Sequence, residues 1–271
     1  MRVFIILMLV FSCSYGQTTR LIYKYEFVPD INIPKTINRE YMYLDIHQKD
    51  SQFYSYRNYN IDSTSVAYSK KGLSYMPPNR EYINFRVIKD FQTSHVSMIT
   101  KIGFIVYEVL DDGELKWKIT NQKATILGYT VLSAETNFRG RSWIAWFASD
   151  IPIQDGPYKF KGLPGLILKI EDDKKNHSFT ATQIVTLIGN EQYPLTENSK
   201  PTKQVSQQNF KKLFIDYRRD PLSSLRGRYP DQTDSQGNFR TGDQVFRDEE
   251  KLFKDRIKKD NNIIEIDLLK L

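Results

Sequence analysis

Alternating apolar and polar positions dominate the first third of the chain. Four segments carry apolar or aromatic side chains at every second position: 21–27, 40–46, 52–57 and 82–88. Successive side chains of a strand point to opposite faces, so this alternation, with Lys24 and Glu26 on the polar side of the first segment, predicts half-buried β-strands. Residues 60–71 are polar and weakly periodic, and we expect a loop or a short helix there.

The central segments have a different pattern, because three of them are apolar on both faces: 102–107, 124–132 and 143–147. Strands of this kind are covered on both sides. We therefore expect helices, the far wall of a curved sheet or a ligand to pack on the second face. Residues 166–171 and 179–188 alternate again, and the polar stretch 172–176 between them predicts the turn of a hairpin.

Helical spacing begins only in the last third of the chain. Ser206 is suited to cap a helix whose apolar side chains recur every three or four residues, and Pro221 ends it. Residues 221–242 are polar and contain Gly and Pro, which predicts a loop. A second amphipathic helix is expected from about Asp243, and a final edge strand within 262–271.

These elements predict an α+β protein that is mostly β. We expect one large, strongly curved antiparallel sheet of about eight to ten strands, a half-barrel, with two C-terminal helices packed on it, because open sheets of that size curl. No Pro-, Gly- or Ser-rich linker divides the strand region. Residues 17–271 are therefore expected to form a single domain.

The first sixteen residues have the layout of a cleaved secretory signal. A basic start at Arg2 precedes the apolar run 3–11, which is too short to span a bilayer, and Ser14 and Gly16 provide small residues. We expect cleavage after Gly16 and export to the periplasm or cell envelope. Lipid anchoring at Cys13 is the alternative. After cleavage the chain has no cysteine, and hence no disulfide.

Charge and motifs exclude several functions. Without Arg2 the chain has 38 Lys and Arg (39 − 1) against 32 Asp and Glu, and this excess of six is spread along the sequence, so we expect no nucleic-acid partner. Nucleophile-elbow, phosphate-loop, zinc-protease and paired-cysteine motifs are absent from the sequence. His47, His95 and His177 are far apart and are read as solvated loop residues. We expect no metal and no cofactor.

Glu135 and Asp150 are the remaining candidates for catalysis. They bracket the segment 139–147, and two carboxylates that approach across a bend would allow acid–base chemistry. Surface charges near turns explain them equally well.

Four residues between these carboxylates are candidates for ligand binding. Arg139 and Arg141 flank Gly140, and two guanidinium groups can grip a carboxylate or phosphate. The alternative is that Gly140 makes a turn and the arginines pair with Asp150, Asp155 or Glu135. Trp143 and Trp146 fall on opposite faces of a strand, so one is a candidate for lining a cavity, and core packing is the alternative.

The following loop is shaped by glycine and proline: Gly156, Pro157, Gly162, Pro164 and Gly165. Pro164 followed by Gly165 predicts a type II turn with a positive φ at Gly165. A backbone nest for an anion is a weaker alternative at this loop.

These residues carry a family resemblance. Gly162-Leu-Pro-Gly-Leu-Ile167, with the flanking stretches 126–129, 138–141 and 145–147, resembles the GLPGLI family of exported, functionally uncharacterised Bacteroidetes proteins. The match is close over about residues 116–172. The order of strands and late helices is also similar to that of periplasmic lipoprotein carriers, in which a half-open sheet surrounds an apolar cavity.

The resemblance implies an envelope protein without known activity. We expect a non-enzymatic protein that binds lipid, another hydrophobic ligand or an outer-membrane partner in the concavity of the sheet, with Arg139 and Arg141 at the rim. A carboxylate-dependent hydrolase and a structural subunit of an outer-membrane transport complex are the alternatives.

Overall fold

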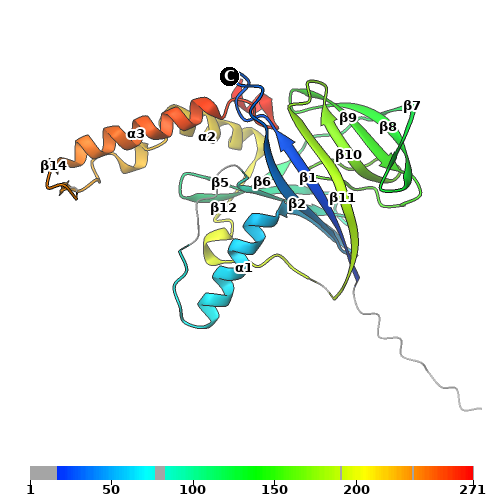
Figure 1. Ribbon diagram of the computed structural model, residues 1–271, viewed down its shortest axis with the longest axis horizontal. Coiled ribbons are helices and arrows are strands. Elements are labelled where there is room, and N and C mark those ends of the chain that lie inside the picture. The colour runs from blue at the N-terminus through cyan, green and yellow to red at the C-terminus, as the bar shows by residue number, and fades with distance from the viewer. Residues whose placement is uncertain (1–16, 77–82, 190, 234, 271) are drawn as a thin grey trace, which may run out of the picture.

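Twelve strands of the described chain form one open, curved sheet (Figure 1). The computed structural model describes residues 17–76, 83–189, 191–233 and 235–270, so the expected signal and Cys13 lie outside the described residues. The strands are β1 (Gln17–Phe27), β2 (Asn38–Ile46), β3 (Asp50–Ser55), β4 (Phe85–Asp90), β5 (Val96–Ile102), β6 (Ile105–Asp111), β7 (Lys118–Ile126), β8 (Tyr129–Phe138), β9 (Arg141–Ala148), β10 (Leu166–Asp172), β11 (His177–Ile188) and β12 (Lys203–Ser206).

The sheet runs in the order β12-β6-β5-β4-β3-β2-β1-β11-β10-β9-β8-β7 and does not close into a barrel. All neighbours are antiparallel except β12, which lies parallel to β6. The mostly β, α+β class and the curved antiparallel sheet are therefore confirmed. The strand number was underestimated, because two of the predicted strands are hairpins and the short strand β12 was not predicted.

The segments 102–107 and 124–132, which we expected to be single strands, each contain a tight turn. Gly103 has a φ of 58° between β5 and β6, and Leu127 and Gly128 have φ values of 52° and 83° between β7 and β8. Positive φ at the first central residue, as at Gly103, or at both, as at Leu127 and Gly128, is typical of the hairpin turns that match strand twist. Phe104 and Leu127 at these tips are 74% and 42% exposed, so apolar side chains that we expected to be covered on both faces lie in solvent.

Helices lie at the margins of the sheet. They are α1 (Tyr56–Lys70), α2 (Gln207–Arg219) and α3 (Gly242–Lys259), with short 3-10 helices at Glu197–Ser199, Ser223–Leu225 and Ile266–Leu269. Ser206 caps α2 by accepting from the amide of Asn209, and α2 ends before Pro221, as predicted. The expected loop 221–242 includes a small hairpin, β13 (Gln232–Thr233) with β14 (Phe239–Arg240), and α3 projects with it away from the sheet (Figure 1).

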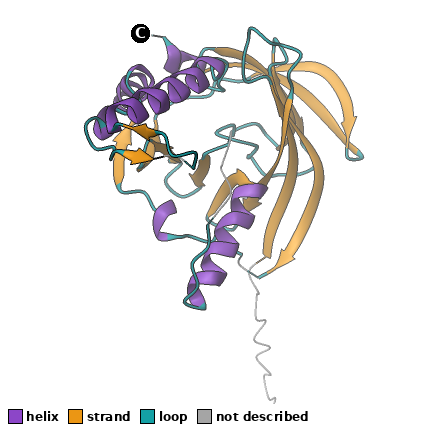
Figure 2. Cartoon of the chain, turned by 60° about the vertical axis from the view of Figure 1, so that its left-hand side comes forward, coloured by secondary structure: helices purple, strands orange, loops and turns teal. Residues whose placement is uncertain are grey.

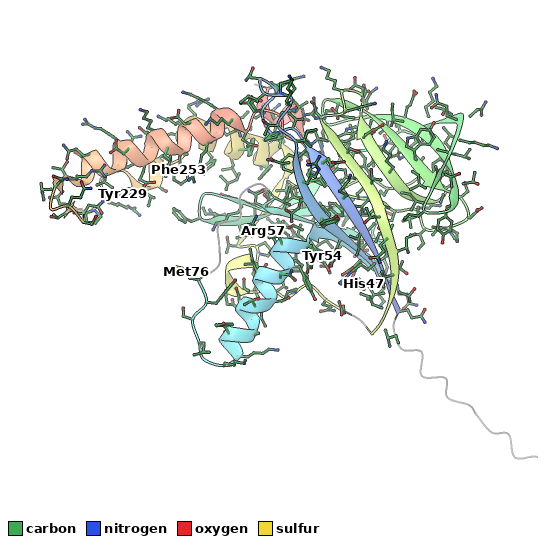
Figure 3. All side chains as sticks on the ribbon, in the orientation of Figure 1. His47, Tyr54, Arg57, Met76, Tyr229 and Phe253 are labelled. Atoms are coloured by element: carbon green, nitrogen blue, oxygen red, sulfur yellow. The ribbon has the colours of Figure 1, made fainter. Side chains whose placement is uncertain are left out.

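Of the loop or short helix expected at 60–71, the structure has the helix, α1, which begins four residues earlier than expected. Its first turn packs on the outer face of β2 and β3 through tyrosines, with the Tyr43 ring 5.1 Å from that of Tyr56. Figure 3 shows Tyr54 beside this turn. Tyr54 and Arg20 both bond to the buried carboxylate of Asp45, which explains a polar cluster under the helix.

The segment between β9 and β10, residues 149–165, lies inside the curve of the sheet, and we call it the inner segment (Figure 2). Its Phe160 ring lies 4.8 Å from that of Trp143 on β9, and its Tyr158 ring lies 5.1 Å from that of Phe85 on β4. Tyr158, Phe160 and Leu163 are all buried. Because β4 and β9 belong to opposite halves of the sheet, the chain itself fills the concave face.

The C-terminal segment is not the predicted edge strand. Residues 260–265 have no regular secondary structure and lead into the 3-10 helix Ile266–Leu269, without pairing in the sheet. Asn262 donates to the carbonyl of Val28, and Asp267 donates its amide to the carbonyl of Arg139. The segment thus crosses one end of the half-barrel, where separate side-chain and backbone hydrogen bonds replace a strand ladder. In the described part of the chain no helix is apolar over a length that would span a bilayer.

Candidate functional site

A pocket of about 340 Å³ lies where the inner segment meets residues 112–117, the connection from β6 to β7. Since β6 and β7 lie near the two edges of the open sheet, this connection crosses the mouth of the half-barrel. Val96, Leu115 and Phe138 supply apolar walls, and Asp111 and Lys159 supply charges at the floor. The volume falls in the range of small-molecule sites, which combine apolar walls with a few placed polar groups.

Strand alternation places Asp111 in the interior. Tyr107 and Val109 precede it on the inward face of β6, and both are buried. Arg139 Nη2 donates to Asp111 Oδ1 at 2.9 Å, and Lys159 Nζ donates to Asp111 Oδ2 at 2.6 Å. The amide of Gly113 completes the contacts of this carboxylate at 2.7 Å.

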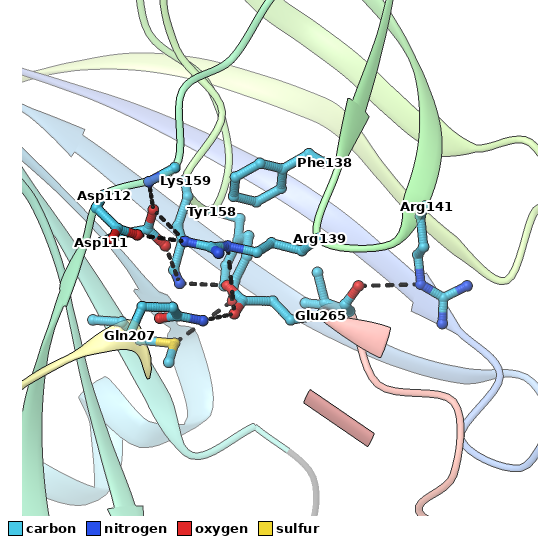
Figure 4. Close-up of polar contacts among 12 residues, drawn as sticks. Asp111, Asp112, Phe138, Arg139, Arg141, Tyr158, Lys159, Gln207 and Glu265 are labelled. Carbon is cyan, nitrogen blue, oxygen red and sulfur yellow. Dashed lines mark hydrogen bonds and ion pairs between the residues drawn. The ribbon is translucent and has the colours of Figure 1, made fainter. Parts of the chain in front are cut away.

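Glu265 lies at the centre of the same cluster (Figure 4). Its carboxylate accepts from Lys159, from the Tyr158 hydroxyl at 2.7 Å and from Gln207 Nε2 at 2.5 Å. Arg139 Nε lies 4.0 Å away. Four parts of the chain therefore meet at one buried carboxylate: the β8–β9 turn, the inner segment, α2 and the C-terminal segment.

The charges of this cluster stabilise one another. Burial alone raises the pKa of Asp111, but Lys159 and Arg139 hold it below its usual value. Burial lowers the pKa of Arg139, yet the carboxylates of Asp111 and Glu265 raise it above normal. Burial and Glu265 raise the pKa of the Tyr158 hydroxyl, which stays neutral and donates. The floor of the pocket is thus a rigid set of fixed charges.

The rim carries charges that are more accessible. Asp112 is 82% exposed at its side chain and lies 3.5 Å from Arg139, while Glu114 forms an exposed contact of 3.3 Å with Lys116. On the inner segment, Lys161 donates to the carbonyl of Ser94 at 2.7 Å. Exposed pairs such as these are weak, so these side chains are available to other partners.

Arg139 and Arg141 do not form a joint anion grip. Arg139 and Gly140 make the two-residue turn between β8 and β9, with φ values of 50° and 83°. Arg141 points elsewhere and bonds to Asp172 Oδ2 at 3.0 Å and to Asn262 Oδ1 at 2.6 Å. The turn agrees with the alternative stated for this motif, but the partners are Asp111, Glu265 and Asp172 rather than Asp150, Asp155 or Glu135.

His177 also binds the C-terminal segment, so its expected position as a solvated loop residue is wrong. Its Nε2–H donates to the carbonyl of Asn262 at 2.8 Å, and its Nδ1 accepts from the Tyr25 hydroxyl at 2.7 Å. Burial, together with the nearby Arg141, lowers the pKa of His177 to about 3. His95 is exposed as expected, whereas His47 bridges Asp50 and the carbonyl of Glu191.

The two tryptophans lie on opposite faces of β9, as alternation requires. Trp143 is buried in the concave core and donates to the carbonyl of Phe138 at 3.1 Å. Trp146 is half-buried and packs against the core from the other face. Neither lines the pocket at the mouth, so their geometry agrees with core packing.

The glycines and prolines of the inner segment place it against the sheet. The carbonyl of Gly156, next to the buried Pro157, accepts from Lys89 Nζ at 2.5 Å. Gly162 lines the pocket with a φ of 90°. The predicted type II turn is instead a three-residue turn around Pro164, in which the amide of Gly165 donates to the carbonyl of Leu163 at 2.8 Å.

Glu135 and Asp150 are both exposed and are not brought together. Glu135 lies opposite Ile144 in the β8–β9 ladder. Ala148, at the end of β9, is four residues further on, or about 13 Å along the strand, and Asp150 follows it. This separation exceeds the spacing of the carboxylate pairs that cleave glycosidic bonds.

The charged residues of the interior were missed from the sequence: Lys89, Asp111, Lys159 and Glu265. The alternation of apolar positions along the strands could have revealed two of them. Lys89 continues the alternation of Phe85 and Val87, and Asp111 continues that of Tyr107 and Val109, so both fall on inward faces. Lys89 pairs with Asp155 at complete burial. The positions of Lys159 and Glu265 depend on distant contacts that no local pattern contains.

Comparisons with known proteins agree with this architecture. A family model described as a protein of unknown function (Porph_ging) matches residues 136–169, from the end of β8 through the inner segment into β10. Two structures of PNGF-II, in space groups C2 and P21, are similar, with TM-scores of 0.53 and 0.51 and 16% identity. No curated protein matches the sequence.

The likeness to PNGF-II shows the fold alone. It covers 73% of this chain in both cases, but only 32% and 33% of the two PNGF-II chains, so this chain spans about a third of their length. The matched stretch includes the motif Gly162–Ile167. The match therefore supports a resemblance to a family of unknown function.

Proposed function

We propose that the chain is an exported member of the GLPGLI family that acts as a non-enzymatic binding protein of the cell envelope. The motif within the matched stretch supports the family, and the order of basic, apolar and small residues in 1–16 supports export. N-terminal analysis of the protein from its native host tests export. A chain that begins at Gln17 is expected, and retention of Met1 would contradict it.

The observation that carries the binding function is the pocket at the mouth of the half-barrel. Its floor is formed by Asp111 and Lys159, which bond to each other, and Glu265 behind them holds Lys159 in place. A ligand therefore meets a preorganised surface, and binding does not require these groups to be reordered.

The pocket favours a small polar ligand over a lipid. A carrier of lipid needs an apolar cavity, but Tyr158, Phe160 and Leu163 of the inner segment are buried, and the first two pack on rings of β4 and β9. The separation of Glu135 from Asp150 gives no support to the alternative hydrolase. We therefore assign the function to binding at the mouth of the half-barrel, by a small molecule that enters between the connection 112–117 and the inner segment.

A pocket-filling substitution tests this function. Purified protein is screened by NMR against a library of small polar metabolites, and Leu115→Trp is compared with Leu195→Trp, which adds the same ring at an exposed site remote in sequence. We expect at least one compound to shift the amide signals of residues 111–115 and 159–162. Its binding should be lost in Leu115→Trp and retained in Leu195→Trp. If no compound binds, or if both variants bind equally, the proposed function is wrong.

A further inference from the structure

The cationic groups at the floor of the pocket are already neutralised. Lys159 lies between the carboxylates of Asp111 and Glu265, and Arg139 bonds to Asp111. These four side chains carry two positive and two negative charges that balance one another, and Asp111 and Lys159 of the four line the pocket. The net charge that a ligand meets is therefore set by the rim.

The rim presents opposite charges on two walls. On the inner segment, the side chain of Lys161 lines the pocket and bonds to the backbone carbonyl of Ser94. On the connection 112–117, Asp112 and Glu114 have largely exposed carboxylates with only loose partners at 3.5 and 3.3 Å. One wall thus suits an acid group and the other an amine.

The walls between these charges are apolar. Val96, Leu115 and Phe138 line the pocket between the inner segment and the connection. An aliphatic or aromatic group that contacts them removes apolar surface from water. A volume of about 340 Å³ accommodates a molecule of a few to a dozen heavy atoms and is small for a lipid.

We propose that the pocket binds a free α-amino acid with an apolar side chain. Lys161 receives the carboxylate, Asp112 and Glu114 receive the ammonium group, and the side chain packs on Phe138 and Leu115. This assignment rests on the proposed function, since it names the ligand class of the same pocket.

The test uses the twenty free amino acids as probes, in calorimetric titrations of the full chain from Gln17. The tightest binder is then compared with its amide, which lacks the negative charge, and with its N-acetyl derivative, which lacks the positive charge. We expect both derivatives to bind at least tenfold more weakly than the amino acid, because each loses one charge-assisted contact.

Rim variants assign each charge to its wall. The double variant Asp112→Asn/Glu114→Gln is expected to weaken binding of the amino acid and of its amide about tenfold, but not that of the N-acetyl derivative. Lys161→Gln is expected to weaken binding of the amino acid and of its N-acetyl derivative about tenfold, but not that of the amide. Glu197→Gln and Lys258→Gln remove exposed charges outside the pocket and serve as controls.

The outcomes separate this proposal from the proposed function. If the metabolite library yields a pocket ligand but none of the twenty amino acids binds, the ligand class is wrong and the binding function stands. Equal affinity for an amino acid, its amide and its N-acetyl derivative would also overturn the zwitterion assignment. If neither the library nor the amino acids bind, both proposals fail.

Discussion

Single buried polar residues hold this fold together at points that carry no sequence motif. His177 links β11 to Tyr25 on β1 and to Asn262 of the C-terminal segment, and it stacks near the ring of Tyr25 at 6.0 Å. Its neutral form is the one that fits, since Nδ1 must accept a hydrogen bond while Nε2 donates one. Protonation of Nδ1 would remove the acceptor from Tyr25.

The depressed pKa of His177 predicts a defined dependence of stability on pH. In the unfolded chain His177 takes up a proton near pH 6.5, but in the folded protein it does so only near pH 3. Between these values the unfolded state binds more protons, so the free energy of unfolding falls by about 1.4 kcal/mol per pH unit as the pH is lowered. Above pH 6.5 this contribution is constant.

Urea unfolding of the wild type and of His177→Gln between pH 3.5 and 8 measures this contribution, because glutamine can donate and accept but does not titrate. The difference between the two proteins is expected to shrink as the pH falls from 6.5. His95→Gln, at an exposed position, should follow the wild type at every pH. If the difference in the free energy of unfolding between wild type and His177→Gln is independent of pH, the protonation of His177 does not contribute to the pH dependence of stability.

At the scale of elements, the sequence predicted strands and helices well and turns poorly. The alternation in 21–27 and the cap at Ser206 depend on near neighbours, so local patterns reveal them. The turns at Gly103 and at Leu127–Gly128 were missed because their tips are apolar, which made each hairpin look like one buried strand. The irregular C-terminal segment was misread because its hydrogen bonds go to backbone and side-chain groups far away in sequence.

The site was predictable only in part, for the same reason. The turn at Gly140 and the opposite faces of Trp143 and Trp146 follow from local geometry. The ion pairs of Lys159 with Asp111 and Glu265 join residues 48 and 106 positions apart. Hydrophobic periodicity contains no information on such pairs.

The end of the inner segment offers a comparison between two glycines. A Cβ at Gly165 would overlap the backbone carbonyl of Ala148, and its φ is 152°. Gly162 has a φ of 90°, but no atom lies within 4 Å of an added Cβ. Gly165→Ala is therefore expected to lower the free energy of unfolding by at least about 2 kcal/mol, and Gly162→Ala by only about 1 kcal/mol from backbone strain. Chemical denaturation compares them, and equal losses would show that the close approach to β9 is unimportant.

At the scale of the whole molecule, the inner segment connects the two halves of an open sheet. An open sheet of twelve strands has no closing ladder between its edge strands β12 and β7, so contacts across the concavity must supply the coupling. The pair of Lys89 on β4 with Asp155 is fully buried, and Lys89 also donates to the carbonyls of Gly156 and Phe160. Burial lowers the pKa of Lys89, while Asp155 counteracts this effect and favours the charged form.

Removal of Lys89 is therefore expected to weaken the coupling as well as the stability. Lys89→Met leaves a buried carboxylate without its partner, which costs about 3–5 kcal/mol. The double variant Lys89→Met/Asp155→Leu removes both charges and should recover part of that loss. All three tryptophans, Trp117, Trp143 and Trp146, lie in or beside the β7–β9 half, so their fluorescence reports on that half and on its contacts with the inner segment.

Hydrogen exchange of amides in β4 and β5 reports on the other half. In the wild type we expect the two probes to give coincident unfolding transitions, because the inner segment makes the half-barrel one cooperative unit. In Lys89→Met the β4–β5 amides should exchange at denaturant concentrations at which the tryptophans are still in their native environment. If both transitions shift together by the same amount, the inner segment adds stability without coupling the halves, and the cooperativity must come from the continuous ladder through β1 and β11.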